Sequence, residues 1–534
     1  MKKLNIFALI FFLILLSVAW NEDVWTNSID KISTIITHIE ENYYQDVDPE
    51  ELAYSSVRGM LQTLDPHSNF LDMRSMSRLT EDYRAKYFGT GMLIQQQGDR
   101  IVVISPIVGG PAYRMGVQSG DVVSHINGDT TKTIDSYEAM QRLRGKKGTE
   151  VTITLDREGL EPFDMTITRE EIPLYSVPYA FVLQDDIGYI FIRNFAETTP
   201  QELREKMDLL TEQGMKKLIL DLRQNGGGAF PQSLEISDEF LPRGSVLVSI
   251  RGRKELYNQE IQAIQNNKYE EIPLIILIDN GSASASEIVS GAMKDNDRAL
   301  IVGEDSFGKG LVQTVFPLTY AQDNRTPETA VSLTIAKYYT PSGRSIQKDY
   351  TNIEDYILQT YRLPVEVPEE EREVTYTAQG RKVFGQGGIT PDYKVTFTNK
   401  PFTFLVQRTG TFFSYARKFV TKNTDLSKLY VFPDEQGDEN LDLKGKKIVD
   451  DNFVVDTPVL EDFKAYLKEL DFDYTADNFE EALEEIKREI KREIFSALWG
   501  VERGWKVLME NDPVVNKAVE VLPESEALLK KSFK

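Results

Sequence analysis

Three serines at alternate positions and one later lysine are the residues best suited to chemistry in this chain. Residues 281–318 read GSASASEIVSGAMKDNDRALIVGEDSFGKGLVQTVFPL, with Ser282, Ser284, Ser286 and Lys309 but no histidine. An apolar strand, LIILI, precedes the serines and a helical pattern begins at Ser284, so they lie where a strand passes into a helix. Such a junction exposes a side chain and directs free N–H groups at it, which suits a nucleophile. Small N-cap serines would suit the same place in a purely structural role.

A serine nucleophile needs a proton acceptor, and histidine does not fit that role here. The chain has three histidines, all well upstream of the serines: His38, His67 and His125. A lysine can act as the base when burial or positive potential lowers its pKa from about 10.4 toward neutrality. Lys309 is the candidate, because it lies between two glycines and directly precedes an apolar strand. Gln313 would share its face of that strand and could orient the amine or the nucleophile.

A tetrahedral oxyanion also needs hydrogen-bond donors. The segment DLRQNGGG, residues 221–228, is a second strand-to-helix junction with three consecutive glycines. Because glycines leave the backbone accessible, the amides of Gly227 or Gly228 could join that of Ala285 around the oxyanion. A flexible turn would use the same glycines.

Together these residues resemble the carboxyl-terminal processing peptidases, tail-specific serine proteases of family S41 with a Ser-Lys dyad. The resemblance depends on SASASE, on a glycine-flanked lysine 25 residues beyond the middle serine (309 − 284 = 25), and on Gln313. It extends to DLRQNGGG, TLDPHSNFLD and AKYYTPSGRSIQ, and covers about residues 30–395.

The resemblance implies a role for each residue of the site. Ser284 would be the nucleophile, Lys309 the general base, and Gln313 the group that positions the lysine. Ala285 with Gly227 or Gly228 would supply the oxyanion donors, and Ser282 and Ser286 would support the site. Two departures concern the oxyanion donors: Gly226 replaces the usual proline, and in Asp279-Asn280 the asparagine stands one place later than usual.

Residues 86–168 change to short β-rich runs separated by Gly, Asn and Asp turns. The segment YFGTGM leads into a strand, and the segment GGPAYRMGVQSGD leads into ING. Together these segments resemble a bacterial PDZ domain. The resemblance implies that a peptide adds as a β-strand while loop amides bind its terminal carboxylate. The expected peptide-binding residues are Phe88, Gly89, Thr90, Gly91 and Met92. A β-rich domain whose glycines only make turns is the alternative.

The expected fold class is multidomain α/β: a ClpP/crotonase-like protease core with an inserted PDZ domain, a helical N-terminal unit and a helical C-terminal region. The expected ranges are 25–85 for the N-terminal unit, 86–168 for the PDZ domain, 175–395 for the core and 400–534 for the C-terminal region. Periodicity leaves three roles open for that last region, namely oligomerisation, capping of the core and docking of a partner.

The first 20 residues, MKKLNIFALIFFLILLSVAW, predict an export signal, either cleaved or retained as an N-terminal membrane anchor. We expect localisation in the bacterial periplasm or on the periplasmic face of the inner membrane.

The chain lacks cysteine, which removes disulfides and thiolate catalysis. Its net charge of −23 argues against nucleic acid as a partner.

The expected function is that of an exported serine endopeptidase without metal or organic cofactor. Its PDZ domain would bind the C-termini of unfolded or tail-bearing proteins, and the core would hydrolyse them through an acyl-enzyme. A non-catalytic scaffold of the same fold stays open, whereas a chymotrypsin-type protease lacks its GDSGG-like serine context here. Ile29 to Ile39 would pack equally well in a homodimer or inside a monomer.

Overall fold

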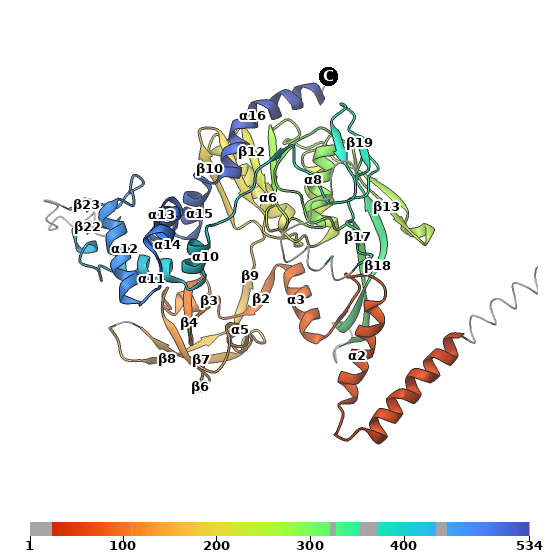
Figure 1. The fold of residues 1–534 in the computed structure, drawn as a ribbon, viewed down its shortest axis with the longest axis horizontal. Coiled ribbons are helices and arrows are strands. Elements are labelled where there is room, and N and C mark those ends of the chain that lie inside the picture. Colours follow the sequence, from red (N-terminus) through yellow and green to blue (C-terminus); the bar gives the residue numbers. More distant parts are fainter. Residues whose placement is uncertain are drawn as a thin grey trace, which may run out of the picture. The chain divides into compact units, whose positions relative to one another are not determined.

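The computed structural model describes residues 24–107, 109–157, 159–320, 327–352, 356, 372–433 and 446–532, and its elements are labelled in Figure 1. The chain divides into two compact units, Met1–Met76 with Gln313–Thr334 and Ser77–Val312 with Ile335–Lys534. The predicted export signal lies outside the described residues. Within the residues that are described, no helix is long and apolar enough to cross a membrane.

The first unit is built from helices and the ends of two long strands. Its elements are a helix over residues 24–42, α2 (Pro49–Gln62), β1 (Asn69–Leu71) and parts of β17 (Leu311–Tyr320) and β18 (Pro327–Tyr339). Asp48 caps α2 by accepting from the amides of Glu50 and Glu51. β1 pairs antiparallel with β18, Phe70 opposite Val331. The helix over residues 24–42 has an open apolar face, whose members include Trp25, Ile29 and Ile35.

A small β-sheet domain opens the second unit, after α3 (Met73–Arg84). Its strands are β3 (Met92–Gln97), β4 (Arg100–Pro106), β5 (Val122–Ile126), β6 (Asp129–Thr130), β7 (Glu150–Asp156) and β8 (Phe163–Thr168). They follow the order β3-β4-β5-β7-β8, with β6 beside β5, so β3 is an edge strand. α4 (Pro111–Arg114) and α5 (Ser136–Leu143) complete the domain. β2 (Lys86–Gly89) and β9 (Glu170–Pro173) pair at its entry and exit.

A six-stranded sheet forms the centre of the second unit (Figure 1). Its strands, in spatial order, are β10 (Tyr179–Gln184), β11 (Ile187–Phe191), β12 (Lys217–Asp221), β15 (Leu274–Ile278), β16 (Leu300–Gly303) and β21 (Tyr393–Lys394). All pairs are parallel except the antiparallel pair of β10 and β11. Parallel sheets of this kind need both faces covered, which explains their nearly continuous apolar strands.

The two faces of this sheet pack against different parts of the chain. Alternate strand residues, such as Leu220 and Ile276, join a core with α6 (Thr199–Glu212), α7 (Phe230–Asp238) and α8 (Ala285–Asp295). The intervening residues, such as Ile219 and Ile275, pack against α15 (Val501–Met509) and α16 (Pro513–Ser532). Two helix layers therefore enclose the sheet, and the last helices of the chain supply one of them.

A second sheet pairs β13 (Val246–Gly252) with β14 (Gln259–Gln262) and with the end of β18, where Ile250 faces Tyr338. Shorter elements are η1 (Glu255–Tyr257) and the hairpin of β19 (Val374–Tyr376) and β20 (Lys382–Phe384). This sheet places Tyr338 at the edge of the core.

The C-terminal region has a core of its own, in which Phe412, Tyr415 and Phe463 are buried together. It contains α10 (Pro401–Arg408), α11 (Thr411–Val420), η3 (Ser427–Leu429), β22 (Tyr430–Val431), β23 (Lys447–Ile448), α12 (Thr457–Glu469), α13 (Ala476–Glu481) and α14 (Leu483–Trp499). α15 and α16 follow and cover the central sheet, where the Ser525 hydroxyl donates to the Leu274 carbonyl at 2.8 Å. Capping of the core is thus one role of this region, while oligomerisation and partner docking stay predictions.

Candidate active site

Ser284 lies at the junction that the sequence pattern predicts. It follows the fully buried strand β15 and is the N-cap of α8. Its side chain is partly exposed, whereas Ala283 and Ala285 on either side are buried. Its backbone has φ 55° and ψ −109°. A non-glycine residue in that region is strained, and such strain persists only where the surroundings enforce it.

The flanking serines have structural roles. The Ser282 hydroxyl donates to the Leu222 carbonyl at 2.8 Å, and the Ser286 hydroxyl donates to the Asn225 carbonyl at 2.7 Å. Both side chains are fully buried. They attach the serine segment to the glycine-rich loop after β12, which leaves Ser284 as the serine of the motif that faces solvent.

Glu287 connects Ser284 to the loop that carries Lys309. Its Oε2 accepts from the amides of Ser284 at 2.8 Å and Lys309 at 2.9 Å. Its Oε1 accepts from the Gly308 amide at 2.7 Å and the Ser306 hydroxyl at 2.5 Å. Burial raises the pKa of this carboxyl, and the hydrogen bonds oppose that rise. This glutamate belongs to the segment SASASE and has no predicted role in the site, although its spacing from Ser284 is that of a capping box.

Tyr338 approaches the same two residues through their carbonyl groups. Its hydroxyl donates to the Ser284 carbonyl at 3.2 Å and to the Lys309 carbonyl. The side chain is buried, and burial raises the pKa of the phenol well above its ordinary value, so it stays a donor. The sequence pattern alone does not identify this residue as part of the site. It lies in the quoted segment AKYYTPSGRSIQ, but no local signal distinguishes it from Tyr339.

Two further backbone hydrogen bonds hold the loop that carries Lys309, between β16 and β17. The Phe307 amide donates to the Ser282 carbonyl at 2.9 Å, and the Lys348 amide donates to the Gly308 carbonyl at 2.9 Å. Lys309 is itself partly exposed. Its backbone is therefore held between the serine segment and the strand ends beyond β18.

The glycine-rich loop lies directly against Ser284. A Cβ added to Gly227 would lie 2.9 Å from the Ser284 Cβ and 3.1 Å from the Ala285 nitrogen. Gly227 has φ +100° and Gly228 has φ +146°, which favour glycine. Asn225 orders the loop, because its Oδ1 accepts from the Gly227 amide at 2.9 Å. The structure thus brings Gly227 and Ala285 together beside Ser284, whereas Gly228 packs against the backbone of Phe195. Gly226, which departs from the family pattern, has open space around its Cα.

Gln313 belongs to a polar chain in the first unit. Its Nε2 donates to the Thr334 hydroxyl at 3.3 Å, and that hydroxyl donates to Asp65 at 3.2 Å. Asp65 also accepts from the amide and hydroxyl of Ser68. Burial alone would raise the pKa of Asp65, but hydrogen bonds, led by that of Ser68, hold the pKa below its ordinary value. The segment TLDPHSNFLD therefore anchors the strand ends around Gln313, whose role toward Lys309 stays a prediction.

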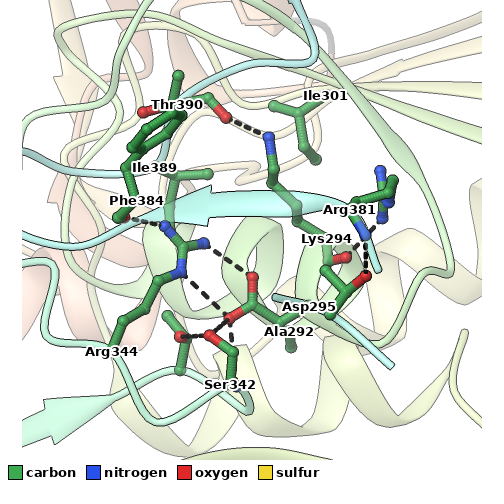
Figure 2. A network of polar contacts seen from close by, with 12 residues as sticks. Ala292, Lys294, Asp295, Ile301, Ser342, Arg344, Arg381, Phe384, Ile389 and Thr390 are labelled. Atoms are coloured by element: carbon green, nitrogen blue, oxygen red, sulfur yellow. Dashed lines mark hydrogen bonds and ion pairs between the residues drawn. The ribbon is translucent and has the colours of Figure 1, made fainter. Parts of the chain in front are cut away.

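The opposite end of α8 is held by a buried ion pair, shown in Figure 2. Arg344 Nη2 donates to Asp295 Oδ1 at 2.8 Å, and both side chains are fully buried. The Ser342 hydroxyl donates to Asp295 Oδ2 at 2.6 Å, and Lys294 donates to the Thr390 carbonyl at 2.6 Å. Burial opposes ionisation of Asp295, yet Arg344 holds its pKa below the ordinary value. The helix that presents Ser284 is therefore fixed at both ends.

The predicted peptide-binding residues lie where β2 passes into β3. Phe88 and Gly89 end β2, and Met92 begins β3. The carbonyls of Thr90 and Gly91 accept from the amides of Ala112 and Ile107, both at 2.9 Å, which orders the loop between the two strands. α5 packs beside β3, the edge strand. An edge strand flanked by a helix can accept an extended peptide as an added strand.

The described residues contain no group of three or more His, Cys, Asp or Glu side chains that could hold a metal ion.

A strained, partly exposed serine at a helix N-terminus, with glycine amides alongside, is the arrangement of a serine hydrolase. Family models match at three places: peptidase family S41 over residues 186–357, a PDZ domain over 97–157 and the N-terminal domain of the activating protease CtpB over 17–75. The site residues Gly227, Ser284 and Lys309 all fall within the peptidase match.

Curated relatives agree with these matches. A carboxy-terminal-processing protease of Bartonella bacilliformis is 36% identical over 332 residues, which cover 61% of this chain and 74% of the relative. The carboxy-terminal processing protease CtpA of Bacillus subtilis is 33% identical over 320 residues, 60% of this chain and 66% of the relative. A solved photosystem II D1 C-terminal processing protease is 26% identical, with a TM-score of 0.36 over 68% of this chain and 86% of that one.

The protein is a serine peptidase with a PDZ domain. The chain belongs to peptidase family S41. The family resemblance and the fold class expected from the sequence are thereby confirmed.

Proposed function

We propose that the protein is an exported serine endopeptidase that binds the C-terminal tails of its substrates through the PDZ domain and cleaves peptide bonds with Ser284 and Lys309. The observation that carries the proposal is the shared acceptor of these two residues. Glu287 Oε2 accepts both amides, at 2.8 and 2.9 Å, and so joins a strained serine to the only lysine of the glycine-flanked loop.

The reaction would proceed in two steps. In acylation, the Ser284 Oγ attacks the scissile carbonyl carbon while the neutral Lys309 amine accepts the hydroxyl proton. The C–N bond then breaks, and the lysine ammonium returns that proton to the leaving amine. In deacylation, water attacks the acyl-enzyme with Lys309 again as the base, which releases the new carboxylate and regenerates Ser284.

The oxyanion donors are assigned to Ala285 and Gly228. Among the residues that the structure describes, no hydrogen bond uses the amide of either one, whereas the Gly227 amide is engaged by Asn225. Gly227 would instead act through its small size, because a side chain at this position would collide with Ser284. The N-terminus of α8 adds positive potential at the same place.

Substrate selection is assigned to the PDZ domain. The tail would extend along the free edge of β3, beside α5, and its terminal carboxylate would meet the amides of the loop over residues 88–92. Unfolded or tail-bearing proteins satisfy this requirement because their C-termini are accessible and extended.

Export is proposed on the basis of the N-terminal segment, with the protein in the periplasm or on the periplasmic face of the inner membrane, where that segment could serve as a tether. The helix over residues 24–42 supports a homodimer, because Trp25 is 67% exposed and Ile29 is 63% exposed.

The test is cleavage of an unfolded protein with an apolar C-terminus between pH 6 and 10. We expect Ser284→Ala and Lys309→Ala to lose activity, and the wild-type rate to rise through a single basic ionisation. Lys254→Ala, at an exposed lysine, is the matched control and should behave as wild type. Equal cleavage by all four proteins would overturn the dyad.

Covalent labelling distinguishes an active serine peptidase from a non-catalytic scaffold of the same fold. A fluorophosphonate probe should modify Ser284 in the wild type and leave Ser284→Ala unmodified. A wild-type protein that neither reacts with the probe nor cleaves any tail-bearing substrate would favour a binding scaffold.

A further inference from the structure

Two buried polar side chains outside the proposed dyad hold its backbone through hydrogen bonds. Glu287 accepts the amide hydrogens of Ser284 and Lys309, and Tyr338 donates to the carbonyl oxygens of the same two residues. All four backbone groups of the dyad are thus hydrogen-bonded to one carboxylate or one phenol, and the two carbonyls share the single proton of the phenol. Neither side chain is needed as a nucleophile, a base or an oxyanion donor.

Ser284 needs such restraint. Its φ of 55° is unfavourable for a residue with a Cβ. A residue keeps a strained backbone only where hydrogen bonds and packing leave it no alternative. Its amide is held by Glu287, and its carbonyl accepts from the Tyr338 hydroxyl as well as from the first amides of α8, while the side chain stays partly exposed.

Tyr338 is itself rigidly placed. It lies on β18, where its neighbour across the sheet is Ile250, and its amide donates to the Gly310 carbonyl at 2.9 Å. The residue is 1% exposed. A change in the position of the Lys309 loop would therefore have to break bonds to both the backbone and the hydroxyl of this residue.

We propose that Tyr338 is a positioning residue of the catalytic dyad: its hydroxyl, acting opposite Glu287, holds the carbonyls of Ser284 and Lys309 and so sets the separation of nucleophile and base. The proposal rests on the function proposed above. In this role Tyr338 acts through the backbone carbonyls of the two residues.

The test is Tyr338→Phe, which keeps the buried ring and removes only the hydroxyl. We expect the single-turnover acylation rate to fall about tenfold to 100-fold, as small misplacements of reacting groups do. KM for a tail-bearing substrate should be unchanged, because the PDZ domain is untouched. The midpoint of the pH–rate profile should also shift, because the surroundings of the Lys309 amine change with its position.

Tyr415→Phe is the matched control. Tyr415 is equally buried, and its hydroxyl also donates to a carbonyl, that of Val459, and to Asp462, within the separate core of the C-terminal region. It should lose some stability and keep the wild-type acylation rate. Rates are expressed per reactive site, titrated with the fluorophosphonate probe, so that a partly unfolded Tyr338→Phe sample still gives a valid comparison.

Glu287→Gln tests the hydrogen bonds that hold the amides of Ser284 and Lys309. A glutamine presents one oxygen and one NH₂ group where two oxygens now accept four donors, so acylation should again slow while KM is unchanged. A wild-type acylation rate and pH profile for Tyr338→Phe would overturn the positioning role, provided that Ser284→Ala and Lys309→Ala are inactive. If those two variants keep activity, the proposed dyad itself fails.

Discussion

The backbone amides of Ser284 and Lys309 donate to the same oxygen atom, Oε2 of Glu287. The two residues are separated by a helix, a strand and a loop in the sequence, so this bond defines their relation in space. A carboxylate oxygen can accept two such donors and is fully satisfied here. Because Glu287 is buried, neither bond competes with water, and movement of one residue is transmitted to the other.

The close approach of Gly227 to Ser284 predicts a severe effect of one added methyl group. Gly227→Ala places a Cβ 2.9 Å from the Ser284 Cβ in a backbone with φ +100°. We expect catalytic activity to fall about 100-fold or more, because the serine or the loop must shift. Cleavage kinetics of the purified variant would measure this.

Gly226→Ala is the control for that substitution. The neighbouring glycine has no atom within 4 Å of an added Cβ and lacks a positive φ. We expect activity within about twofold of wild type, since surface changes of this kind rarely cost more than about 0.5 kcal/mol. Equal losses of activity in both variants would show that the close approach of the added Cβ to Ser284 is not the cause.

The buried pair of Asp295 and Arg344 predicts a strong coupling energy. Removing either partner alone leaves an uncompensated charge in a fully buried place, at a cost of about 3–5 kcal/mol. The double variant Asp295→Leu, Arg344→Met should be less destabilised than the sum of Asp295→Leu and Arg344→Met. Urea denaturation of the four proteins measures the cycle, and additive effects would contradict the prediction.

The same ion pair predicts that the stability of the folded protein decreases at acid pH. The folded pKa of Asp295 lies below its ordinary value, so at acid pH the unfolded chain binds more protons at this group. Its contribution is complete above about pH 4, the unfolded pKa, and is lost as pH falls through the folded pKa. Thermal unfolding from pH 3 to 7 should therefore depend less on pH in Asp295→Asn than in wild type.

The edge strand β3 predicts that tail binding requires a free carboxylate. In Ser284→Ala, which lacks the proposed nucleophile, a fluorescent peptide with an apolar C-terminus should bind at least about tenfold more tightly than its C-terminal amide. Fluorescence anisotropy measures both. Equal affinities would show that the loop over residues 88–92 does not bind the terminal charge.

The apolar pattern of the sequence predicted the secondary structure around Ser284 and Lys309. The buried strand before Ser284, the helix after it and the strand after Lys309 are all where apolar periodicity placed them. Choosing Ser284 among the three serines needed the family resemblance, because Ser282 and Ser286 are chemically equivalent in the sequence. Only their contacts with the loop after β12 show that their hydroxyls are already engaged.

The sequence by itself determined which residues are candidates for chemistry: a serine at a strand-to-helix junction and a glycine-flanked lysine, with no histidine in the same stretch. These are local properties of residue type and spacing. The tertiary structure alone decided the partners of those residues, as Tyr338 shows, because its contacts join segments that are 54 and 29 residues away. It also decided that α16 covers the central sheet, since periodicity defines an apolar face but not the surface against which that face packs.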